Sequence, residues 1–241
     1  MRRNPTNMYD PLRIVITGAS SGIGEAIALE MAKDSHRFYL TGRNADRLQQ
    51  VAEKINALGS EAHIGVGDVG DEYDVEQLFD DVINTMGGVD VLVANAGVGF
   101  FGLLEELTIE QYDIQFRTNV RGVFLWLRKV LPGMKRQNRG QIIVTSSNLG
   151  LKTTSRGSVY AATKHAVQAM VWCLRDELKG TMVKAATINP GSVSTPWFDG
   201  KDVDRSKMLT AHDVANAVRL IIDQSETSNI DHILLLPGIT E

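Results

Sequence analysis

The chain has 241 residues, 43% of them hydrophobic, and a formal net charge of -4 at pH 7. This length suits one large α/β domain with a sizeable core, and the mild charge without a basic stripe argues against a nucleic-acid or membrane-surface partner. Cys173 is the only cysteine, which excludes an internal disulfide and favours a reducing compartment.

The first eleven residues, MRRNPTNMYDP, contain two arginines with no apolar core behind them, unlike a secretory signal. We expect residues 1–11 to form a flexible leader and residues 12–241 to form a single catalytic domain. The longest weakly polar run, Val91–Leu104, is interrupted by glycines and is shorter than the roughly 20 residues that a membrane span needs. We therefore expect a cytoplasmic protein with no membrane association.

Short apolar runs alternate with helical patterns along the first part of the chain. Buried strands are predicted at Arg13–Thr17 and Arg37–Thr41, and a third strand over residues 61–67 leads to Asp68. Apolar residues at helical spacing follow each of these strands in turn: Ile23, Ile27 and Met31; Leu48, Val51, Ala52, Ile55 and Leu58; Val75, Leu78, Phe79, Val82 and Met86.

The same alternation continues to the end of the chain. The run Val89–Asn95 has almost no polar alternation, which is typical of a strand covered on both faces. Long helices are predicted at about Thr108–Arg136, interrupted near Asn119, and at Ser158–Lys179. The remaining predicted elements are strands at Gln141–Ser147, residues 182–190 and residues 231–237, and a helix at Val214–Ile222.

This pattern predicts an α/β fold: a single-domain, Rossmann-like, doubly wound parallel sheet of about seven strands with helices on both faces. The crossovers should be right-handed, and the ligand should lie beyond the carboxyl ends of the strands. Residues 192–209 form the one long stretch without a clear period, and we expect them to be a substrate loop or lid.

A glycine-rich turn, TGASSGIG, follows the first strand directly and opens the first helix. Glycine permits positive φ and close backbone approach, and a helix N-terminus offers free N–H groups to phosphate oxygens. A plain tight turn uses the same residues, but the position between strand and helix favours a nucleotide cradle. The expected contacts are Gly18, Ser20, Ser21, Gly22, Ile23 and Gly24.

The end of the second strand bears on the choice of cofactor. An NAD site carries an acid about 20 residues past the glycines to bind the ribose 2′-hydroxyl. Here Gly42 and Arg43 take that place, and a guanidinium suits a 2′-phosphate. We therefore expect NADP(H) rather than NAD(H), unless Arg43 is only a solvated charge. Asp68 is expected to accept from the adenine amino group, or else to be a turn residue.

Tyr160 and Lys164 are four residues apart, a spacing that stacks them on one face of a helix. Ser147, thirteen residues before Tyr160, should face the same crevice. A phenol has a pKa near ~10, and a close ammonium group lowers that pKa by stabilising the phenolate. The three residues therefore predict proton transfer to a substrate oxygen beside a nicotinamide that transfers hydride. By itself the stretch also fits a half-buried tyrosine beside a solvated lysine.

Together these motifs resemble the short-chain dehydrogenase/reductase (SDR) family, over nearly the whole chain after residue 11. The resemblance implies that Tyr160 is the general acid/base, that Lys164 lowers its pKa and binds the nicotinamide ribose, and that Ser147 orients the substrate oxygen. It implies that Asn119 holds a water that links Lys164 to a proton relay. The matching segments are TGASSGIG, Asp68–Val69, ANAG at residues 94–97, Asn119, Ser147, Tyr160–Lys164 and PGSVST at residues 190–195.

The resemblance also implies cofactor contacts beyond the glycine turn, and one departure from the family pattern bears on them. The family commonly has NNAG where this chain has Ala94 as the first residue and keeps Asn95 to brace the central strand. If only the backbone of residue 94 matters, nothing is lost, and we favour this alternative over an altered cofactor affinity. The implied contacts are Val69, Asn95, Ala96, Gly97, Tyr160, Lys164, Pro190, Gly191, Val193 and Thr195.

The activity implied is NADP(H)-dependent interconversion of a carbonyl group and a secondary alcohol on a small molecule, with reduction the favoured direction. Residues 95–124 are also similar to bacterial sepiapterin-type reductases, and residues 174–184 to 3-hydroxy acid dehydrogenases. Both similarities rest on scaffold residues, so a diketone, a pterin and a 3-hydroxy or 3-keto acid remain open as substrates. The alternative is a catalytically silent NADP(H) sensor, which the intact Ser–Tyr–Lys–Asn set disfavours.

Several side chains are candidates for the substrate pocket. The pairs Phe100–Phe101 and Trp197–Phe198 could line it or could be ordinary loop packing. Lys152 and Arg156 could bind a substrate carboxylate or phosphate, although such charges are more often solvated. The five histidines show no ligand spacing, so no metal site is expected.

Two helical stretches, residues 120–131 and 160–174, are apolar around most of their circumference. A helix of this kind is normally covered on all sides, and one sheet layer leaves a face over for a partner. The family resemblance likewise implies a homodimer or homotetramer through the long helices near residues 108–136 and 158–179. The alternative is a thicker core within one chain.

Overall fold

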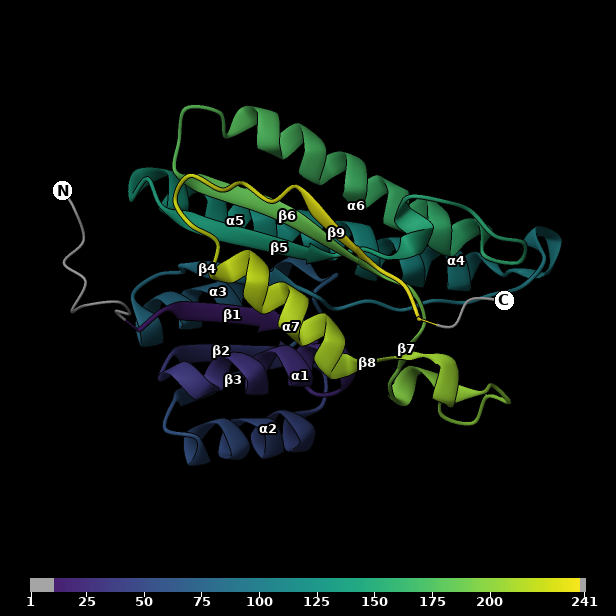
Figure 1. Cartoon of the computed structure of the whole chain (residues 1–241), viewed down its shortest axis with the longest axis horizontal. Helices are drawn as coiled ribbons and strands as arrows, with labels where there is room; N and C mark the ends of the chain where they lie inside the picture. Colours follow the sequence, from purple (N-terminus) through teal and green to yellow (C-terminus); the bar gives the residue numbers. More distant parts are fainter. Residues whose placement is uncertain (1–10, 239–241) are drawn as a thin grey trace.

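A single parallel sheet organises the chain (Figure 1). The computed structural model describes residues 11–238, so the leader expected over residues 1–11 lies outside the described part except for its last residue. The sheet has seven strands in the order β3-β2-β1-β4-β5-β6-β9, and every neighbouring pair is parallel. The strands are β1 (Arg13–Thr17), β2 (Arg37–Gly42), β3 (Glu61–Val66), β4 (Val91–Ala94), β5 (Gly140–Thr145), β6 (Val183–Pro190) and β9 (His232–Leu235).

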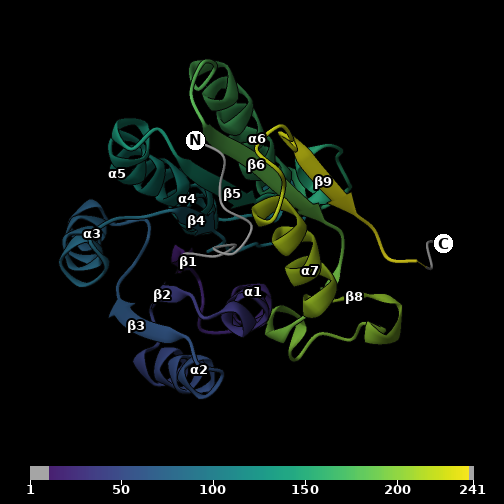
Figure 2. The same cartoon turned by 60° about the vertical axis from the view of Figure 1, so that its left-hand side comes forward.

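Helices cover both faces of the sheet, as the turned view makes plain (Figure 2). One face carries α1 (Gly22–Met31), α2 (Ala45–Ala57) and α7 (Ala211–Ile222), and their buried residues form one hydrophobic core with the sheet. The second core lies under the helices of the other face. These are α3 (Glu72–Met86), α4 (Ile109–Phe116), α5 (Gly122–Arg136) and α6 (Ser158–Glu177). The predicted doubly wound fold is confirmed.

Local signals in the sequence explain where several helices begin and end. The side chain of Asn44 accepts from the Arg47 amide to cap α2, and Asp71 caps α3 by accepting from two amides. Thr108 and Gln111 form a capping box at the start of α4. Leu58, expected on the buried face of α2, is 49% exposed because the helix ends one residue before it.

The long helix predicted over residues 108–136 is interrupted near Asn119, as expected. Residues Arg117–Arg121 form a π-helical turn between α4 and α5. A π-turn adds a residue to the helical register and re-aims the side chains around it, and such turns are frequent at functional sites. Here Asn119 lies in the turn, and its side chain is buried against the segment after β4 and against α6.

Ser147 lies just outside the strand that was predicted to contain it. The strand β5 ends at Thr145, and Ser147 caps a short 3₁₀ turn over Asn148–Gly150 by accepting from the Leu149 amide. The strand was predicted too long because its apolar run gives no sign of where the ladder with β6 stops. The strand predicted over Val89–Asn95 is also too long. The observed strand β4 ends at Ala94, because the Asn95 amide donates to Thr17 Oγ1 instead of to a neighbouring strand.

Residues 192–209, predicted to be irregular, contain short ordered elements. The strand β7 (Val193–Ser194) pairs with β8 (Leu209–Thr210), which closes the base of the segment. Two 3₁₀ turns lie between them, at Pro196–Phe198 and Arg205–Lys207. Arg205 donates to the Thr195 carbonyl oxygen and to Asp199, and these bonds join the second 3₁₀ turn to the residues on either side of the first.

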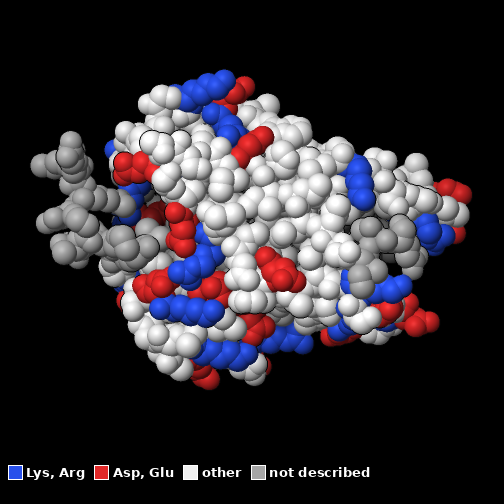
Figure 3. Space-filling view, in the orientation of Figure 1, with Lys and Arg blue, Asp and Glu red and all other residues white. Residues whose placement is uncertain are grey.

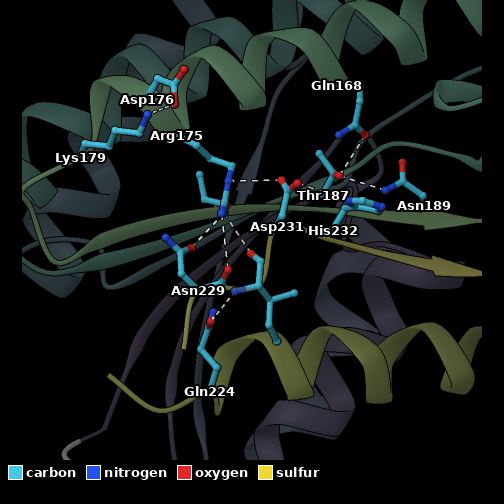
Figure 4. A network of polar contacts seen from close by, with 12 residues as sticks. Gln168, Arg175, Asp176, Lys179, Thr187, Asn189, Gln224, Asn229, Asp231 and His232 are labelled. Atoms are coloured by element: carbon cyan, nitrogen blue, oxygen red, sulfur yellow. Dashed lines mark hydrogen bonds and ion pairs between the residues drawn. The ribbon is translucent and has the colours of Figure 1, made fainter. Parts of the chain in front are cut away.

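A polar network fixes the last strand to the sheet (Figure 4). Arg175 on α6 donates to the Ala185 and Ile230 carbonyl oxygens and pairs with Asp231 at 3.2 Å. Thr187 on β6 donates to Gln168 of α6 at 3.0 Å. The Arg175 contacts fix residues 230 and 231, directly before β9, against α6, while the Thr187 bond joins β6 to α6. β9 itself pairs with β6 through four residues at the sheet edge.

No helix within residues 11–238 is both long enough and apolar enough to cross a membrane.

Candidate active site

A cleft of about 1160 Å³ lies at the carboxyl ends of the strands. Its walls come from the glycine turn after β1, the segment after β4 and the segments after β5 and β6. The strand order reverses between β1 and β4, where the two crossovers leave the sheet in opposite directions. This switch point is where doubly wound sheets bind ligands.

The glycine turn is built for close approach of the backbone. Gly18 has φ +64°, and a Cβ there would lie 2.8 Å from the Cα of Ala96. A Cβ on Gly24 would overlap the Gly18 carbonyl oxygen, so α1 can pack against the turn only with glycine at that position. Ser21, the N-cap of α1, makes no side-chain capping bond. The first amides of α1 are therefore left to bind an anion.

Asn95 braces the turn against β4. Its amide nitrogen Nδ2 donates to the carbonyl oxygens of Thr17 and Gly18, at 3.2 and 3.3 Å, and Thr17 Oγ1 accepts from the amides of Asn95 and Ala96. Ala94, where the family commonly has asparagine, is buried in β4 and does not line the cleft. The expectation that only the backbone matters at residue 94 stays a prediction.

Cations stand at the β2 end of the cleft. Arg43 lines it as expected, and so does Arg47, which the sequence analysis did not single out. Arg47 lies in the first turn of α2, whereas Arg43 precedes the N-cap Asn44, so no helical spacing relates the two in the sequence. Asp68 also lines the cleft, but its carboxylate pairs with Arg117 at 2.9 Å and accepts from the Gly70 amide. An adenine amino group would have to share that carboxylate.

Ser147, Tyr160 and Lys164 all line the cleft, so the structure brings together the three residues predicted to do the chemistry. Lys164 is 4% exposed, and its ammonium group donates to the Thr145 carbonyl oxygen at 2.8 Å. The same ammonium lies 5.7 Å from the centroid of the Tyr160 ring. Tyrosine and lysine thus share one environment, and the picture of a solvated lysine on a helix surface is wrong.

Burial dominates the pKa values of both groups. It raises the pKa of the Tyr160 phenol to about 12, while the nearby Ser147 hydroxyl acts in the opposite direction. It lowers the pKa of Lys164 to about 8. The expected lowering of the phenol pKa by Lys164 is not seen in this arrangement, because the ammonium faces the ring and the Thr145 carbonyl oxygen. At neutral pH Tyr160 is therefore a protonated phenol, which is the form that can donate a proton.

Asn119 does not line the cleft but joins the segment after β4 to α6 through hydrogen bonds. Its Oδ1 accepts from the Val98 amide at 2.8 Å, and its Nδ2 donates to the Val98 carbonyl oxygen and to Thr163 Oγ1. A Cβ on Gly97 would lie 3.3 Å from Asn119 Oδ1 and 3.5 Å from Lys164 Nζ, so both side chains crowd this glycine. The Asn119 side chain is thus engaged by protein groups, and the expected water remains a prediction.

Aromatic rings surround Tyr160 on the substrate side. The Phe101 ring centroid lies 5.1 Å from that of Tyr160, and the Trp197 ring stands edge-on at 6.0 Å. Gly99 was not predicted, yet a Cβ there would lie 2.7 Å from Trp197 and 2.8 Å from Tyr160. Phe100 and Phe198 line the cleft as well. The aromatic pairs are therefore cleft walls and not only loop packing.

The charged candidates separate into two kinds. Lys152 lines the cleft, whereas Arg156 lies outside it and pairs with Glu106 at 3.5 Å. Lys201, which was not predicted, lines the cleft with its ammonium 5.6 Å from the Trp197 ring and 5.3 Å from the Phe198 ring. The fold of residues 192–209 decides this contact, and no spacing in the sequence reveals it.

Comparisons with known proteins agree with this arrangement. Residues 13–205 match the family model described as short chain dehydrogenase. An uncharacterized oxidoreductase of Staphylococcus epidermidis is 34% identical over 223 residues, which cover 92% of this chain and 96% of that protein. An alcohol dehydrogenase from the archaeon Thermococcus sibiricus, complexed with 5-hydroxy-NADP, superposes with a TM-score of 0.90. It is 32% identical, with 96% of this chain and 99% of that chain covered. A metagenomic short-chain oxidoreductase in complex with NADP has a TM-score of 0.84 at 30% identity, covering 95% and 98%.

The buried ammonium of Lys164 makes a pH-dependent prediction about stability. In the unfolded chain the lysine holds its proton up to about pH 10.5, and in the folded protein only to about 8. Between these values the unfolded state binds more protons, so the free energy of unfolding gains a contribution that rises with pH. Replacing Lys164 by Met removes that gain. The stability of Lys164→Met relative to wild type should therefore fall by about 3 kcal/mol between pH 8 and 10.5.

Chemical denaturation across this pH range measures the difference directly. Lys135→Met is the matched control, since Lys135 is exposed at the end of α5, and its difference from wild type should stay constant. A Lys164→Met difference that is flat with pH would contradict the burial of a charge at this position.

Proposed function

The chain belongs to the short-chain dehydrogenase family, and we propose that it is an NADP(H)-dependent enzyme that reduces a carbonyl group of a small molecule to a secondary alcohol, or reverses that step. The observation that carries the proposal is the convergence of Ser147, Tyr160 and Lys164 on the cleft that the glycine turn opens. The phenol of Tyr160, the hydroxyl of Ser147 and the ammonium of Lys164 meet there, beyond the carboxyl ends of the strands.

The residues of the cleft fit a dinucleotide from end to end. The free amides of α1 and the turn at Gly18 suit the pyrophosphate, and Arg43 and Arg47 suit a 2′-phosphate. Lys164 would contact the nicotinamide ribose. The segment after β6 would hold the carboxamide, through Pro190, Gly191, Val193 and Thr195, all of which line the cleft. Both solved structures described above are complexes with NADP or a derivative, which supports the same choice.

When bound, NADPH supplies the hydride. The chain must then place the carbonyl carbon and provide a proton at its oxygen. Ser147 donates a hydrogen bond to that oxygen and holds it next to the Tyr160 hydroxyl. Tyr160 gives its proton to the oxygen as negative charge develops there, and its high pKa keeps the proton available at neutral pH. The buried ammonium of Lys164 is close enough to stabilise the phenolate that remains.

The aromatic walls have a role in this step as well. Phe101 and Trp197 flank the Tyr160 ring and place apolar surface beside it. Low local polarity strengthens the attraction between a phenolate and an ammonium group. In the oxidative direction the same groups act in reverse, with the phenolate as base. The segment 192–209 carries Trp197, and we propose that it is the substrate loop.

Tyr160→Phe removes only the hydroxyl and should keep the ring packing. We expect NADPH binding within about twofold of wild type and turnover reduced by ~10²–10⁴-fold, because the proton donor is lost. NADPH oxidation with a panel of diketones, pterins and β-keto acids measures the turnover. Tyr73→Phe, at an exposed tyrosine, is the control. Retained turnover in Tyr160→Phe would exclude this phenol as the donor, and tight NADPH binding by wild type without any turnover would indicate a sensor.

Arg43→Ala tests the choice of cofactor. The guanidinium is proposed to bind the 2′-phosphate that only NADPH carries, so its loss should weaken NADPH binding about tenfold or more and NADH binding little. Arg43 makes no ion pair with any residue in the range 11–238, so the variant breaks no described ion pair. Arg136→Ala on the end of α5 is the control. Equal losses for the two nucleotides would refute the phosphate contact.

We also propose a homo-oligomer through the long helices. Each of the helices α4, α5 and α6 has an exposed large apolar side chain. Ile114 of α4 is 42% exposed, Phe124 of α5 48% and Trp172 of α6 45%. The space-filling view shows a broad area with few charges over the middle of α6 and over β6 and β9 (Figure 3). A contiguous exposed apolar patch marks an association surface, and we propose that these helices form one.

Sedimentation at micromolar concentration should give a dimer or tetramer for wild type and a smaller species for the pair Phe124→Asp and Trp172→Asp. The charges would be placed in a desolvated contact, which costs several kcal/mol per unpaired ion. The control pair Leu58→Asp and Val66→Asp, at exposed positions at the end of α2 and of the edge strand β3, should leave the assembly intact. A monomeric wild type would contradict the proposal.

A further inference from the structure

The cleft carries a local excess of positive charge that the net charge of the chain does not predict. The whole sequence has 25 basic and 29 acidic residues. Among the residues that line the cleft, all of them described, the only acid is Asp68, and its carboxylate already pairs with Arg117. The basic residues on the cleft wall are Arg43, Arg47, Lys152, Lys164 and Lys201.

The proposed cofactor accounts for three of these five cations. Arg43 and Arg47 stand at the β2 end, where the 2′-phosphate is proposed to bind, and Lys164 lies under Tyr160. Lys152 and Lys201 belong to other segments. Lys152 follows the 3₁₀ turn that Ser147 begins, and Lys201 lies in the segment 192–209 beside Trp197. The cations beyond the catalytic tyrosine thus have no partner in the cofactor as proposed.

No carboxylate in the described part of the chain lies within ion-pair distance of Lys152 or Lys201. The Lys201 ammonium is instead held over the faces of Trp197 and Phe198, an arrangement that keeps the charge at the cleft wall. By contrast, Arg205, a few residues away, pairs with Asp199 at 2.8 Å.

Apolar surface lies alongside these charges. Phe101, Tyr160 and Trp197 present their rings to the cleft, and Gly99 leaves the space between the last two open, because any side chain there would meet both rings. The substrate half of the cleft therefore combines flat apolar walls with two cations that pair with no carboxylate within residues 11–238.

We propose that the substrate is an anion: a carbonyl compound whose carboxylate or phosphate group faces Lys152 and Lys201 and whose apolar part packs between Phe101 and Trp197. This rests on the proposed function, since the carbonyl oxygen is taken to lie at Ser147 and Tyr160. The anionic group takes no part in the reaction, in which the carbonyl carbon gains a hydride and its oxygen gains a proton. It raises affinity and steers the substrate into the cleft.

The size of the effect follows from the exposure of the two lysines. An exposed ion pair contributes little, so each lysine should account for about a two- to fivefold gain in affinity, and the pair for about tenfold. A cleft lined by one sign of charge also raises the association rate of an opposite charge, and salt weakens this gain. Salt sensitivity is therefore part of the expected signature.

Three probes of similar shape test the proposal: 4-acetylbenzoate, 4-acetylphenyl phosphate and the uncharged 4-acetylbenzamide. Calorimetry measures their binding to the full chain saturated with NADP⁺, where no turnover occurs. At least one anionic probe should bind about tenfold tighter than the amide, and the tighter of the two identifies carboxylate or phosphate. The double variant Lys152→Gln and Lys201→Gln should remove this preference without changing amide binding. Lys135→Gln is the control.

Equal binding of charged and uncharged probes to wild type, or no binding of any of them, would overturn the proposal. So would a double variant that weakens all probes alike, or one that leaves the preference intact. NADPH oxidation by the same probes is measured separately. A protein that prefers the anions but oxidises no NADPH would refute the proposed function while the charge preference stands, so the two failures can be told apart.

Discussion

A buried ammonium group is the constraint on which the rest of the active cleft depends. Lys164 is almost fully inaccessible, and an unpaired charge in such a place is costly unless polar groups surround it. The Thr145 carbonyl oxygen at the end of β5 accepts from it, while Ser146 Oγ donates to the Lys164 carbonyl oxygen. Gly150 packs against the same carbonyl, so the end of β5 and the helix α6 are locked together around this one residue.

The contacts around Lys164 also fix the position of the proposed proton donor, Tyr160. Tyr160 precedes Lys164 by one turn of α6, so fixing the lysine also fixes the phenol beside it. The π-turn holds α6 as well, because Asn119 bonds both to Thr163 of α6 and to Val98 in the segment after β4. The geometry of proton transfer is therefore set by backbone elements, while the loop segments that carry Trp197 and Lys152 are left to set the substrate.

The sequence predicted the fold well, since its strands are nearly all apolar and glycine, proline and capping residues separate them. It also pointed to the residues that meet in the cleft, because strand ends and helix starts of a parallel sheet converge at one edge. The misses have a common cause. Arg47, Gly99 and Lys201 lie in the cleft through contacts between distant segments, and the pairing of Arg156 with Glu106 is of the same kind. No local period carries such information.

The pKa of Tyr160 was the property of the site least predictable from the sequence. The i, i+4 spacing of Tyr160 and Lys164 suggested a phenol with a lowered pKa, but burial of the phenol raises its pKa instead. Our account requires the lysine to oppose that rise when the phenol ionises beside the nucleotide. The most direct test is an ultraviolet titration of the Tyr160 phenolate with NADP⁺ bound, using Tyr160→Phe as the blank, in wild type and in Lys164→Met. Tyr160 should ionise at distinctly lower pH in wild type than in Lys164→Met. Identical titration curves would contradict it.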